Sequence, residues 1–360
     1  MRKLCVLIIS ALISLVGCGS SNSGTPSYTT GSTYETSAPL VVSTIAGTAG
    51  SVGSVDATGT SARFGQANGV IVSPDGKFLY VTDYGNSTIR KMDLSNGSVT
   101  TLAGSAGLTG TTDGSGTVAR FNGPHQITTD GTNLYVTDYI NNSIRQIVIA
   151  SGVVTTLAGS TSGSAGTVDG IGTAVRFNGP SGITITSDGT ALYVTDSINN
   201  SIRKIAIATG TVTTLAISAT LSNPAAIICD SSGTILYLTD FNSNMIRKIL
   251  ISSGVVTNIA GSTSYYGSAD GTGTAASFNG PNGITLLGTN LYATDSYNNT
   301  VRKIVVATGA VTTVAGSAGT PGSTDGTGIT ARFNFPTGIT TDGTSLYVTD
   351  SSNATIRKIQ

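Results

Sequence analysis

The chain has 360 residues, with 47 glycines, no tryptophan, 10% charged side chains and a formal net charge of zero. This composition excludes a nucleic-acid binder, which needs clustered surplus Lys and Arg, and a disordered acidic chain, which combines net charge with few hydrophobic residues. The 39% hydrophobic fraction is ample for a core, and the excess of Gly, Thr and Ser predicts many short strands joined by tight turns.

Residues 1–17 are predicted to be an export signal. Arg2 and Lys3 precede an apolar run of 13 residues, 4–16, which is too short to span a bilayer comfortably. The following sequence, Leu15-Val16-Gly17-Cys18, resembles the lipobox of bacterial lipoproteins. That resemblance implies that Cys18 is lipidated and becomes the mature N-terminus; the alternative is an ordinary signal with a coincidental cysteine. Loss of Arg2 and Lys3 leaves 16 basic and 18 acidic residues.

Residues 18–39 are mostly Ser, Thr and Gly, with Glu35 as the one charge, and are predicted to be a flexible tether. The lipoprotein resemblance implies attachment to a membrane through the N-terminal lipid, in the bacterial cell envelope. Gly19 stands where an Asp often retains such proteins at the inner membrane, so we expect the outer membrane or the cell surface. Residues 40–360 remain as the folded domain.

Within that domain, one unit is repeated six times. The sequence L-Y-V-T-D and its close variants end at Asp83, Asp138, Asp196, Asp240, Asp295 and Asp350, which are 55, 58, 44, 55 and 55 residues apart. In the second copy, alternation predicts strands over 126–129, 134–137, 143–149 and 153–158. Four antiparallel strands in each of six equivalent units predict an all-β fold, the six-bladed β-propeller.

The two ends of the domain complement each other. The last copy stops after its third strand, at 356–360, and an additional fourth strand, 41–47, precedes the first copy. We expect this N-terminal strand to join the last blade, because doing so closes the ring and hides two open sheet edges. A closed ring is expected to be monomeric.

Several elements recur in the same order and resemble the NHL repeat family of six-bladed propellers. They are the L-Y-V-T-D strand, a D-x-x-N turn, an I-R-K-I strand and an upstream A-R-F-N-G-P element, as at 119–124. The chain departs from that family at the histidine position after the turn, which holds Ser87, Asn142, Asn200, Asn244, Asn299 and Ala354. The fourth unit also lacks the Gly-rich crossing with its A-R-F element.

Nearly every charge is repeated from blade to blade. The I-R arginine and the turn aspartate of each copy are expected to pair across their hairpin, and after removal of the signal only Lys77, Glu35 and Asp93 have no counterpart in the repeat. Because catalysis needs titratable groups in unlike environments, this pattern favours binding over catalysis. His125 is the one histidine, which excludes a zinc site built from several histidines.

The candidate binding residues are positions that differ between the copies and are expected on the face that carries the turns and crossings. Aromatic side chains follow the turn aspartate at Tyr84, Tyr139 and Phe241, with Tyr297 one residue later in the fifth copy. A second ring precedes the innermost strands, near the channel mouth: Asn68, His125, Ser181, Ala225, Asn282 and Thr337, of which all but Ala225 are candidates. These groups suit stacking on and hydrogen bonding to a sugar or peptide. The alternative is that they cover neighbouring crossings and hold water.

The sequence therefore predicts a lipid-anchored, non-catalytic scaffold that binds a protein, peptide or glycan, with no cofactor and no nucleic-acid partner. The enzymatic alternative is a calcium-dependent hydrolase or lactonase with its site at the mouth of the central channel. Calcium stays open because carboxylates and Asn oxygens are plentiful, although the D-G-x-G-T crossings lack the spacing of a known calcium loop.

Overall fold

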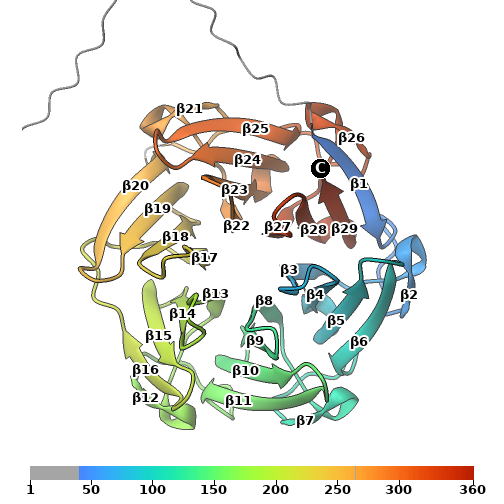
Figure 1. Cartoon of the computed structure of the whole chain (residues 1–360), viewed down its shortest axis with the longest axis vertical. Helices are drawn as coiled ribbons and strands as arrows, with labels where there is room; N and C mark the ends of the chain where they lie inside the picture. The colour runs from blue at the N-terminus through green and yellow to red at the C-terminus, as the bar shows by residue number, and fades with distance from the viewer. Residues whose placement is uncertain (1–39, 264) are drawn as a thin grey trace, which may run out of the picture. The chain divides into compact units, whose positions relative to one another are not determined.

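The computed structural model of this protein describes residues 40–263 and 265–360. These residues form six antiparallel sheets arranged as blades around a central channel (Figure 1). The predicted six-bladed β-propeller is therefore confirmed. The export signal, Cys18 and the tether lie outside the described residues. Among the described residues, no helix is long and apolar enough to cross a membrane.

Each blade, numbered 1 to 6 in chain order, contains four strands that run from the channel outward. The innermost strands are β3 (Ala67–Val72), β8 (Pro124–Thr129), β13 (Pro180–Ile185), β17 (Pro224–Cys229), β22 (Pro281–Leu287) and β27 (Pro336–Thr341). The second strands are β4 (Phe78–Asp83), β9 (Asn133–Asp138), β14 (Ala191–Asp196), β18 (Ile235–Asp240), β23 (Asn290–Asp295) and β28 (Leu346–Asp350). The third strands are β5 (Thr88–Asp93), β10 (Ser143–Val148), β15 (Ser201–Ala206), β19 (Met245–Leu250), β24 (Thr300–Val305) and β29 (Thr355–Ile359). The fourth strands are β6 (Ser98–Gly104), β11 (Val153–Gly159), β16 (Thr211–Thr214), β20 (Val255–Gly261), β25 (Ala310–Gly316) and, for blade 6, β1 (Val41–Ala46).

Five of the six blades carry a fifth, two-residue strand that the sequence did not predict. It comes from the crossing, directly after the aspartate of the D-G-x-G-T sequence or its variants at 56–60 and 325–329, pairs with the fourth strand and continues into a 3-10 turn. The short strands are β2 (Ala57–Thr58), β7 (Gly114–Ser115), β12 (Gly170–Ile171), β21 (Gly271–Thr272) and β26 (Gly326–Thr327). The 3-10 turns are η1 (Gly59–Ser61), η3 (Gly116–Val118), η4 (Gly172–Ala174), η5 (Gly273–Ala275) and η7 (Gly328–Thr330). Three further 3-10 turns, η2 (Tyr84–Asn86), η6 (Ser296–Asn298) and η8 (Ser351–Asn353), follow second strands.

The N-terminal strand closes the ring as predicted. In Figure 1, β1 lies beside β29, and the two strands pair antiparallel with Val42 opposite Ile359. Val41 and Gln360 exchange backbone hydrogen bonds of 2.8 and 3.0 Å. Ring closure therefore ties the first described strand to the last and leaves neither as an open edge.

The hydrophobic core lies between neighbouring blades. Tyr80 and Ile89 of blade 1, for example, pack in one buried cluster with Ile127, Leu134 and Ile147 of blade 2. The alternation of the strands places such residues on faces that stack against the next blade. Each blade is thus buried on both faces by its neighbours in the ring.

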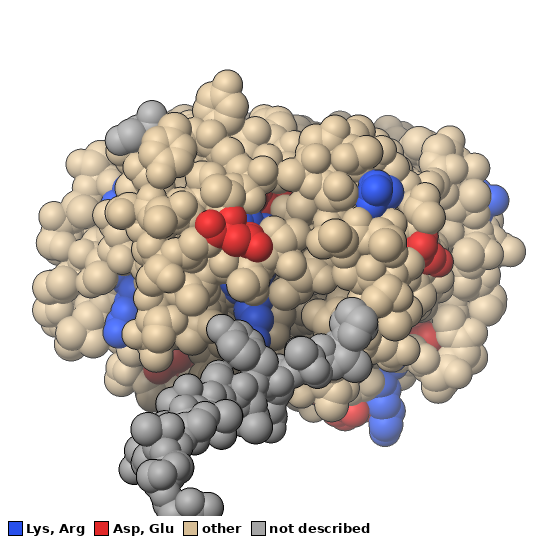
Figure 2. All heavy atoms as spheres, turned by 90° about the horizontal axis from the view of Figure 1, so that it is seen from above, with Lys and Arg blue, Asp and Glu red and all other residues tan. Residues whose placement is uncertain are grey.

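The I-R arginine and the turn aspartate pair in every blade, as expected. In blade 2, Arg145 donates from Nη1 to Asp138 at 2.9 Å and from Nη2 to Asp113 of the crossing at 2.7 Å. Its guanidinium carbon also lies 5.0 Å from the ring centroid of Phe121. Burial raises the pKa of Asp138, Asp295 and Asp350 alike to about 6. Because the same shift recurs in three blades, it belongs to the blade architecture. These arginines are buried, and the face drawn in Figure 2 shows few charged atoms.

The threonine of L-Y-V-T-D joins each blade to the next. All six hydroxyls donate to a backbone carbonyl on the innermost strand of the following blade, over 2.5–2.8 Å. Thr349 closes the series by donating to Asn68 of blade 1. The carbonyls belong to Asn68, His125, Ser181, Ala225, Asn282 and Thr337. The backbone around the channel mouth is therefore fixed by hydrogen bonds between blades.

Candidate functional site at the channel mouth

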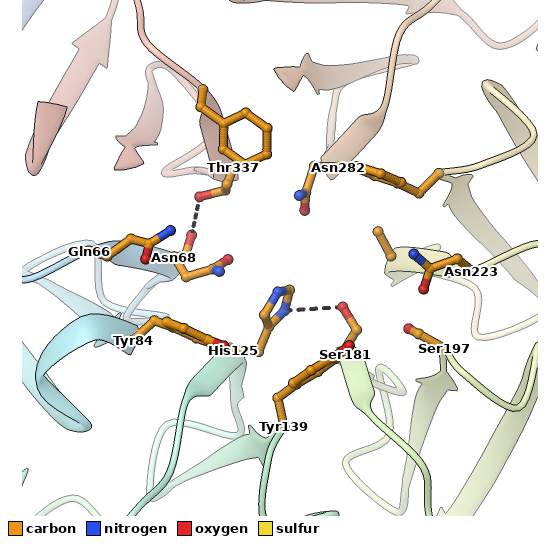
Figure 3. Close-up of a pocket in the computed structure, with 13 residues that line it drawn as sticks. Gln66, Asn68, Tyr84, His125, Tyr139, Ser181, Ser197, Asn223, Asn282 and Thr337 are labelled. Carbon is orange, nitrogen blue, oxygen red and sulfur yellow. Dashed lines mark hydrogen bonds between the residues drawn. The ribbon is translucent and has the colours of Figure 1, made fainter. Parts of the chain in front are cut away.

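A cavity of about 440 Å³ opens where the innermost strands begin (Figure 3). Its lining comes from three positions of the repeat: the residue before the first strand, the second residue of that strand, and the residue after the turn aspartate. The thirteen lining residues are Gln66, Asn68, Tyr84, His125, Tyr139, Ser181, Ser197, Asn223, Ala225, Phe241, Asn282, Phe335 and Thr337.

Eight of the nine predicted binding residues line this cavity. Tyr297 is outside the lining, but its ring centroid lies 5.8 Å from that of Phe241 and 5.3 Å from that of Phe335. The structure therefore brings the predicted residues together at the channel mouth.

The residue after the turn aspartate is aromatic in three blades and serine in the other three, and this difference gives two kinds of junction between neighbouring blades. Where the turn aspartate is followed by Tyr84, Tyr139 or Phe241, the ring lies across a glycine of the next crossing. A Cβ added at those glycines would lie 2.8, 3.1 and 3.0 Å from the respective rings, at Gly123, Gly179 and Gly280. Each of these aromatic side chains thus packs closely against a glycine of the neighbouring blade.

At the other three junctions a serine follows the turn aspartate. Ser197, Ser296 and Ser351 donate hydrogen bonds to backbone carbonyls of the next blade, at Pro224, Pro336 and Ala67 respectively. The small side chain leaves room for a larger one before the next first strand, and Asn223, Phe335 and Gln66 occupy that position. The lining is therefore set by matched pairs of residues across each junction.

The sequence prediction missed one lining position altogether, the residue before the first strand, which is Gln66, Asn223 or Phe335. Ser197 and Ala225 occupy the two repeat positions that were predicted but were not among the nine candidate binding residues. A signal for Phe335 was present, since Phe-Pro stands where three other copies have Gly-Pro. Phe335 has φ = 53° and Asn223 has φ = 52°, the left-handed region that bulky residues rarely adopt. Gly123, Gly179 and Gly280 have φ of 63–64° at the same position, so this conformation belongs to the blade architecture, and Phe335 is unusual in adopting it with an aromatic side chain.

His125 sits between two tyrosines on one side of the mouth. Its ring centroid lies 6.2 Å from that of Tyr84 and 5.4 Å from that of Tyr139, and its Nδ1 is 3.1 Å from Ser181 Oγ. Burial lowers the pKa of His125 from 6.5 to about 4, so the imidazole is neutral at neutral pH. Figure 3 shows His125 and Asn282 reaching into the cavity from opposite sides.

We expect the single histidine to titrate with a pKa near 4, measurable as one imidazole resonance in the proton NMR spectrum of untagged protein. Because the folded pKa lies below the unfolded value, the folded state binds fewer protons, and stability falls as the pH drops below 6.5. Relative to a His125→Gln variant, the protein should lose about 1–2 kcal/mol of unfolding free energy between pH 7.5 and pH 5. An imidazole that titrates near 6.5 would show that His125 is not enclosed.

The lining contains no Asp, Glu, Lys or Arg. Two of its acceptors lack hydrogen-bond donors: Asn68 and Asn282 are 5% and 7% exposed, and neither Oδ1 has a partner. Buried polar atoms are normally paired, so these two oxygens are unsatisfied acceptors beside the cavity, with almost no surface of their own open to it. The arrangement suits an uncharged molecule with hydroxyl or N–H donors and an apolar face.

The residues that line the cavity also bear on the alternative of a calcium-dependent enzyme. Hard divalent cations take carboxylate ligands in most protein sites, and none lines this cavity, so the residues do not fit such an ion. In the described parts of the chain, no group of three or more His, Cys, Asp or Glu lies close enough together to hold a metal. Ser181 and His125 have the spacing of a nucleophile and base, but no lining carboxylate orients the imidazole, and its lowered pKa makes it a weak base.

A family model described as "Lactonase, 7-bladed beta-propeller" matches residues 66–264, more than half of the chain. The chain belongs to this family. Within it, the chain has six blades instead of seven. NHL repeat-containing protein 2 of Bos taurus is 33% identical over 159 residues, 41% of this chain and 22% of that protein. This similarity supports the resemblance to NHL repeats.

A second relative, SUPPRESSOR OF QUENCHING 1 of Arabidopsis thaliana, is 27% identical over 320 residues, 87% of this chain and 26% of that protein. The chain thus spans about a quarter of the length of the curated relatives it matches. Among solved structures, an auxiliary nutrient binding protein from Bacteroides ovatus is 20% identical with a TM-score of 0.72, over 90% of this chain and 77% of that one. Virginiamycin B lyase from Staphylococcus aureus is 17% identical with a TM-score of 0.52, over 82% and 94% of the two chains. These structures share the fold.

Proposed function

We propose that the protein is a non-catalytic binding scaffold whose channel-mouth cavity takes an uncharged part of its ligand. The observation that carries this proposal is the lining itself, which combines aromatic rings with amide, hydroxyl and imidazole groups and has no ionisable carboxylate or ammonium group. Propellers of similar fold include proteins described as auxiliary nutrient binding proteins, which supports a binding role.

A neutral glycan is the favoured ligand class. Asn68 and Asn282 line the cavity with side-chain amides, and sugar hydroxyls can donate to and accept from amide groups. Tyr84 and Tyr139 offer flat faces for the apolar side of a sugar ring, on either side of His125. An anionic ligand would find no positive side chain in the lining, and a cationic one no carboxylate. A peptide or protein segment without charge is the other outcome of the test.

The test is a binding screen with neutral oligosaccharides and uncharged peptides, each paired with a version that carries one carboxylate. We expect neutral oligosaccharides to bind, and each acidic version to bind more weakly because its charge loses hydration without gaining a partner. A preference for the acidic versions would overturn the proposal.

Lactonase activity is the second candidate, because the matching family description names it. Metal analysis of the purified protein separates the two candidates. A stoichiometric divalent ion would favour the hydrolase or lactonase over the scaffold, although the cavity residues do not fit such an ion.

We further propose that the scaffold is anchored to the bacterial cell envelope by a lipid on Cys18, in the outer membrane or at the cell surface. The supporting feature is the sequence Leu15-Val16-Gly17-Cys18 after a short apolar run. A Cys18→Ser variant should lose acylation, seen as a mass difference, and should move from the membrane fraction to the soluble fraction. A variant that stays acylated and membrane-bound would contradict the anchor.

A further inference from the structure

Blade 4 lacks the element that covers the outer strand of every other blade. Among the residues that the structure describes, its sheet has four strands and β20 has no two-residue partner, because the preceding crossing is shortened. Val256 on β20 is partly exposed, whereas its counterparts Val99, Val154, Val212, Val311 and Val42 are 1–2% exposed. Asn258, further along the same strand, is exposed. The outer edge of blade 4 is therefore open where the other blades are closed.

In the other five blades the crossing supplies an aspartate that is held by three donors. Arginine Nη2 donates to this carboxylate over 2.7–2.9 Å. A threonine of the outer strand donates from its backbone N–H over 2.9–3.1 Å and from its hydroxyl over 2.9–3.0 Å. The aspartate side chains are 45–49% exposed, so this position lies at the surface.

Blade 4 keeps the arginine and lacks the carboxylate, and its guanidinium is turned so that Nη2, which binds the crossing aspartate in the other blades, contacts Asp240 instead. Arg247 contacts Asp240 at 2.6 Å and Ser243 Oγ at 3.4 Å, and within the described residues its guanidinium makes no further hydrogen bond. Each equivalent arginine makes four: two to aspartates and two to crossing carbonyls, as Arg145 does. Asn258 lies opposite Arg247, just as Thr156 lies opposite Arg145. Its N–H and side-chain amide can donate as the threonine does.

The shortened crossing replaces only some of the hydrogen bonds that the missing two-residue strand would make with β20. Ser218 N donates to Gly254 O at 2.9 Å, as Gly116 N does to Gly152 O in blade 2, and Ser218 Oγ accepts from Val256 N at 2.9 Å. Ser218 therefore makes two hydrogen bonds around the start of β20, one of them equivalent to the bond made just after the two-residue strand in blade 2. The carboxylate position beside Arg247 and Asn258 has no such replacement among the described residues.

We propose that Arg247 and Asn258 form a binding site for a carboxylate supplied from outside the blade. A buried guanidinium with unused N–H donors is costly, and a carboxylate satisfies it with charge-assisted hydrogen bonds. The carboxylate belongs either to a small free acid or to an acidic residue of a partner protein. The site lies on the outer strands of blade 4 and is independent of the channel-mouth cavity.

The test follows the backbone amide signal of residue 258 by ¹⁵N NMR of the whole protein. The probes are sodium acetate at constant ionic strength and the capped peptide Thr-Asp-Gly-Ser-Gly-Thr, which copies residues 112–117 and carries one carboxylate. Saturable shifts with acetate and peptide of similar affinity identify a small-acid site. A peptide that binds at least about tenfold more tightly than acetate identifies a partner's acidic segment.

Two variants and one control peptide make the result specific. Asn258→Asp places a carboxylate opposite Arg247, so it should weaken binding of both probes at least about tenfold and raise the unfolding temperature. Asn258→Thr restores the residue type of the other blades and should retain binding. The peptide with Asn in place of Asp should not bind. The proposal is overturned if neither probe gives a saturable shift, or if the Asn peptide binds as well as the Asp peptide.

Discussion

Replacing Arg145 by alanine is expected to lower the free energy of unfolding by about 3–5 kcal/mol, the loss typical of breaking a buried ion pair. Arg145 and Asp138 are both 0% exposed, and the arginine also bonds Asp113 and the carbonyls of Arg120 and Thr112. Removal of the Arg145 side chain leaves the buried Asp138 carboxylate without this ion pair and opens a cavity beside Phe121. Urea denaturation followed by circular dichroism measures the change.

The same substitution in blade 4 is the matched control. Arg247 has one ion pair and no crossing aspartate, so Arg247→Ala should cost less than Arg145→Ala by about 1–2 kcal/mol. Arg120→Ala, at a partly exposed arginine of the crossing that bonds backbone carbonyls, should cost about 1 kcal/mol or less. Equal losses for Arg145→Ala and Arg247→Ala would show that the crossing aspartates add nothing to stability.

Combined replacement of Tyr84, Tyr139 and Phe241 by alanine is expected to weaken binding of a ligand found in the glycan screen by about 10- to 1000-fold. Each ring contributes about 0.5–1.5 kcal/mol beyond its buried area, and binding at the mouth would lose all three. Isothermal titration calorimetry gives the affinity, and circular dichroism checks that the sheets remain.

Tyr266→Ala is the control for that experiment. Tyr266 is 73% exposed and lies outside the lining, so its loss should leave the affinity unchanged. If the triple variant binds as tightly as the unaltered protein, the ligand is not held at the channel mouth.

Most of the architecture was readable from the repeats. The alternation within each copy predicted four strands, and the stray strand at 41–47 predicted the ring closure that β1 and β29 show. The pairing of Arg145 with Asp138 followed from their constant spacing. The fifth strand was not predicted, since a two-residue strand such as Gly114–Ser115 is too short to produce alternation and forms only against an outer strand.

The candidate site was partly predictable for a similar reason. Residues that vary between copies pointed to Tyr84, Tyr139 and the ring around His125, because the repeat places equivalent positions on one face. Phe335 was missed because its role depends on Ser296 of the neighbouring blade, whose small side chain leaves the space for a ring. Such a pairing of residues between blades cannot be seen within one copy.

For this protein, hydrophobic alternation and repeat spacing are local properties of the chain, and they were enough to establish the blade, the number of blades and the closure of the ring. The neutral cavity, the enclosed imidazole of His125 and the unsatisfied Arg247 arise where segments from different blades meet. Low overall charge gave no indication of them, since burial and the count of hydrogen-bond partners depend on neighbours that are distant in the sequence.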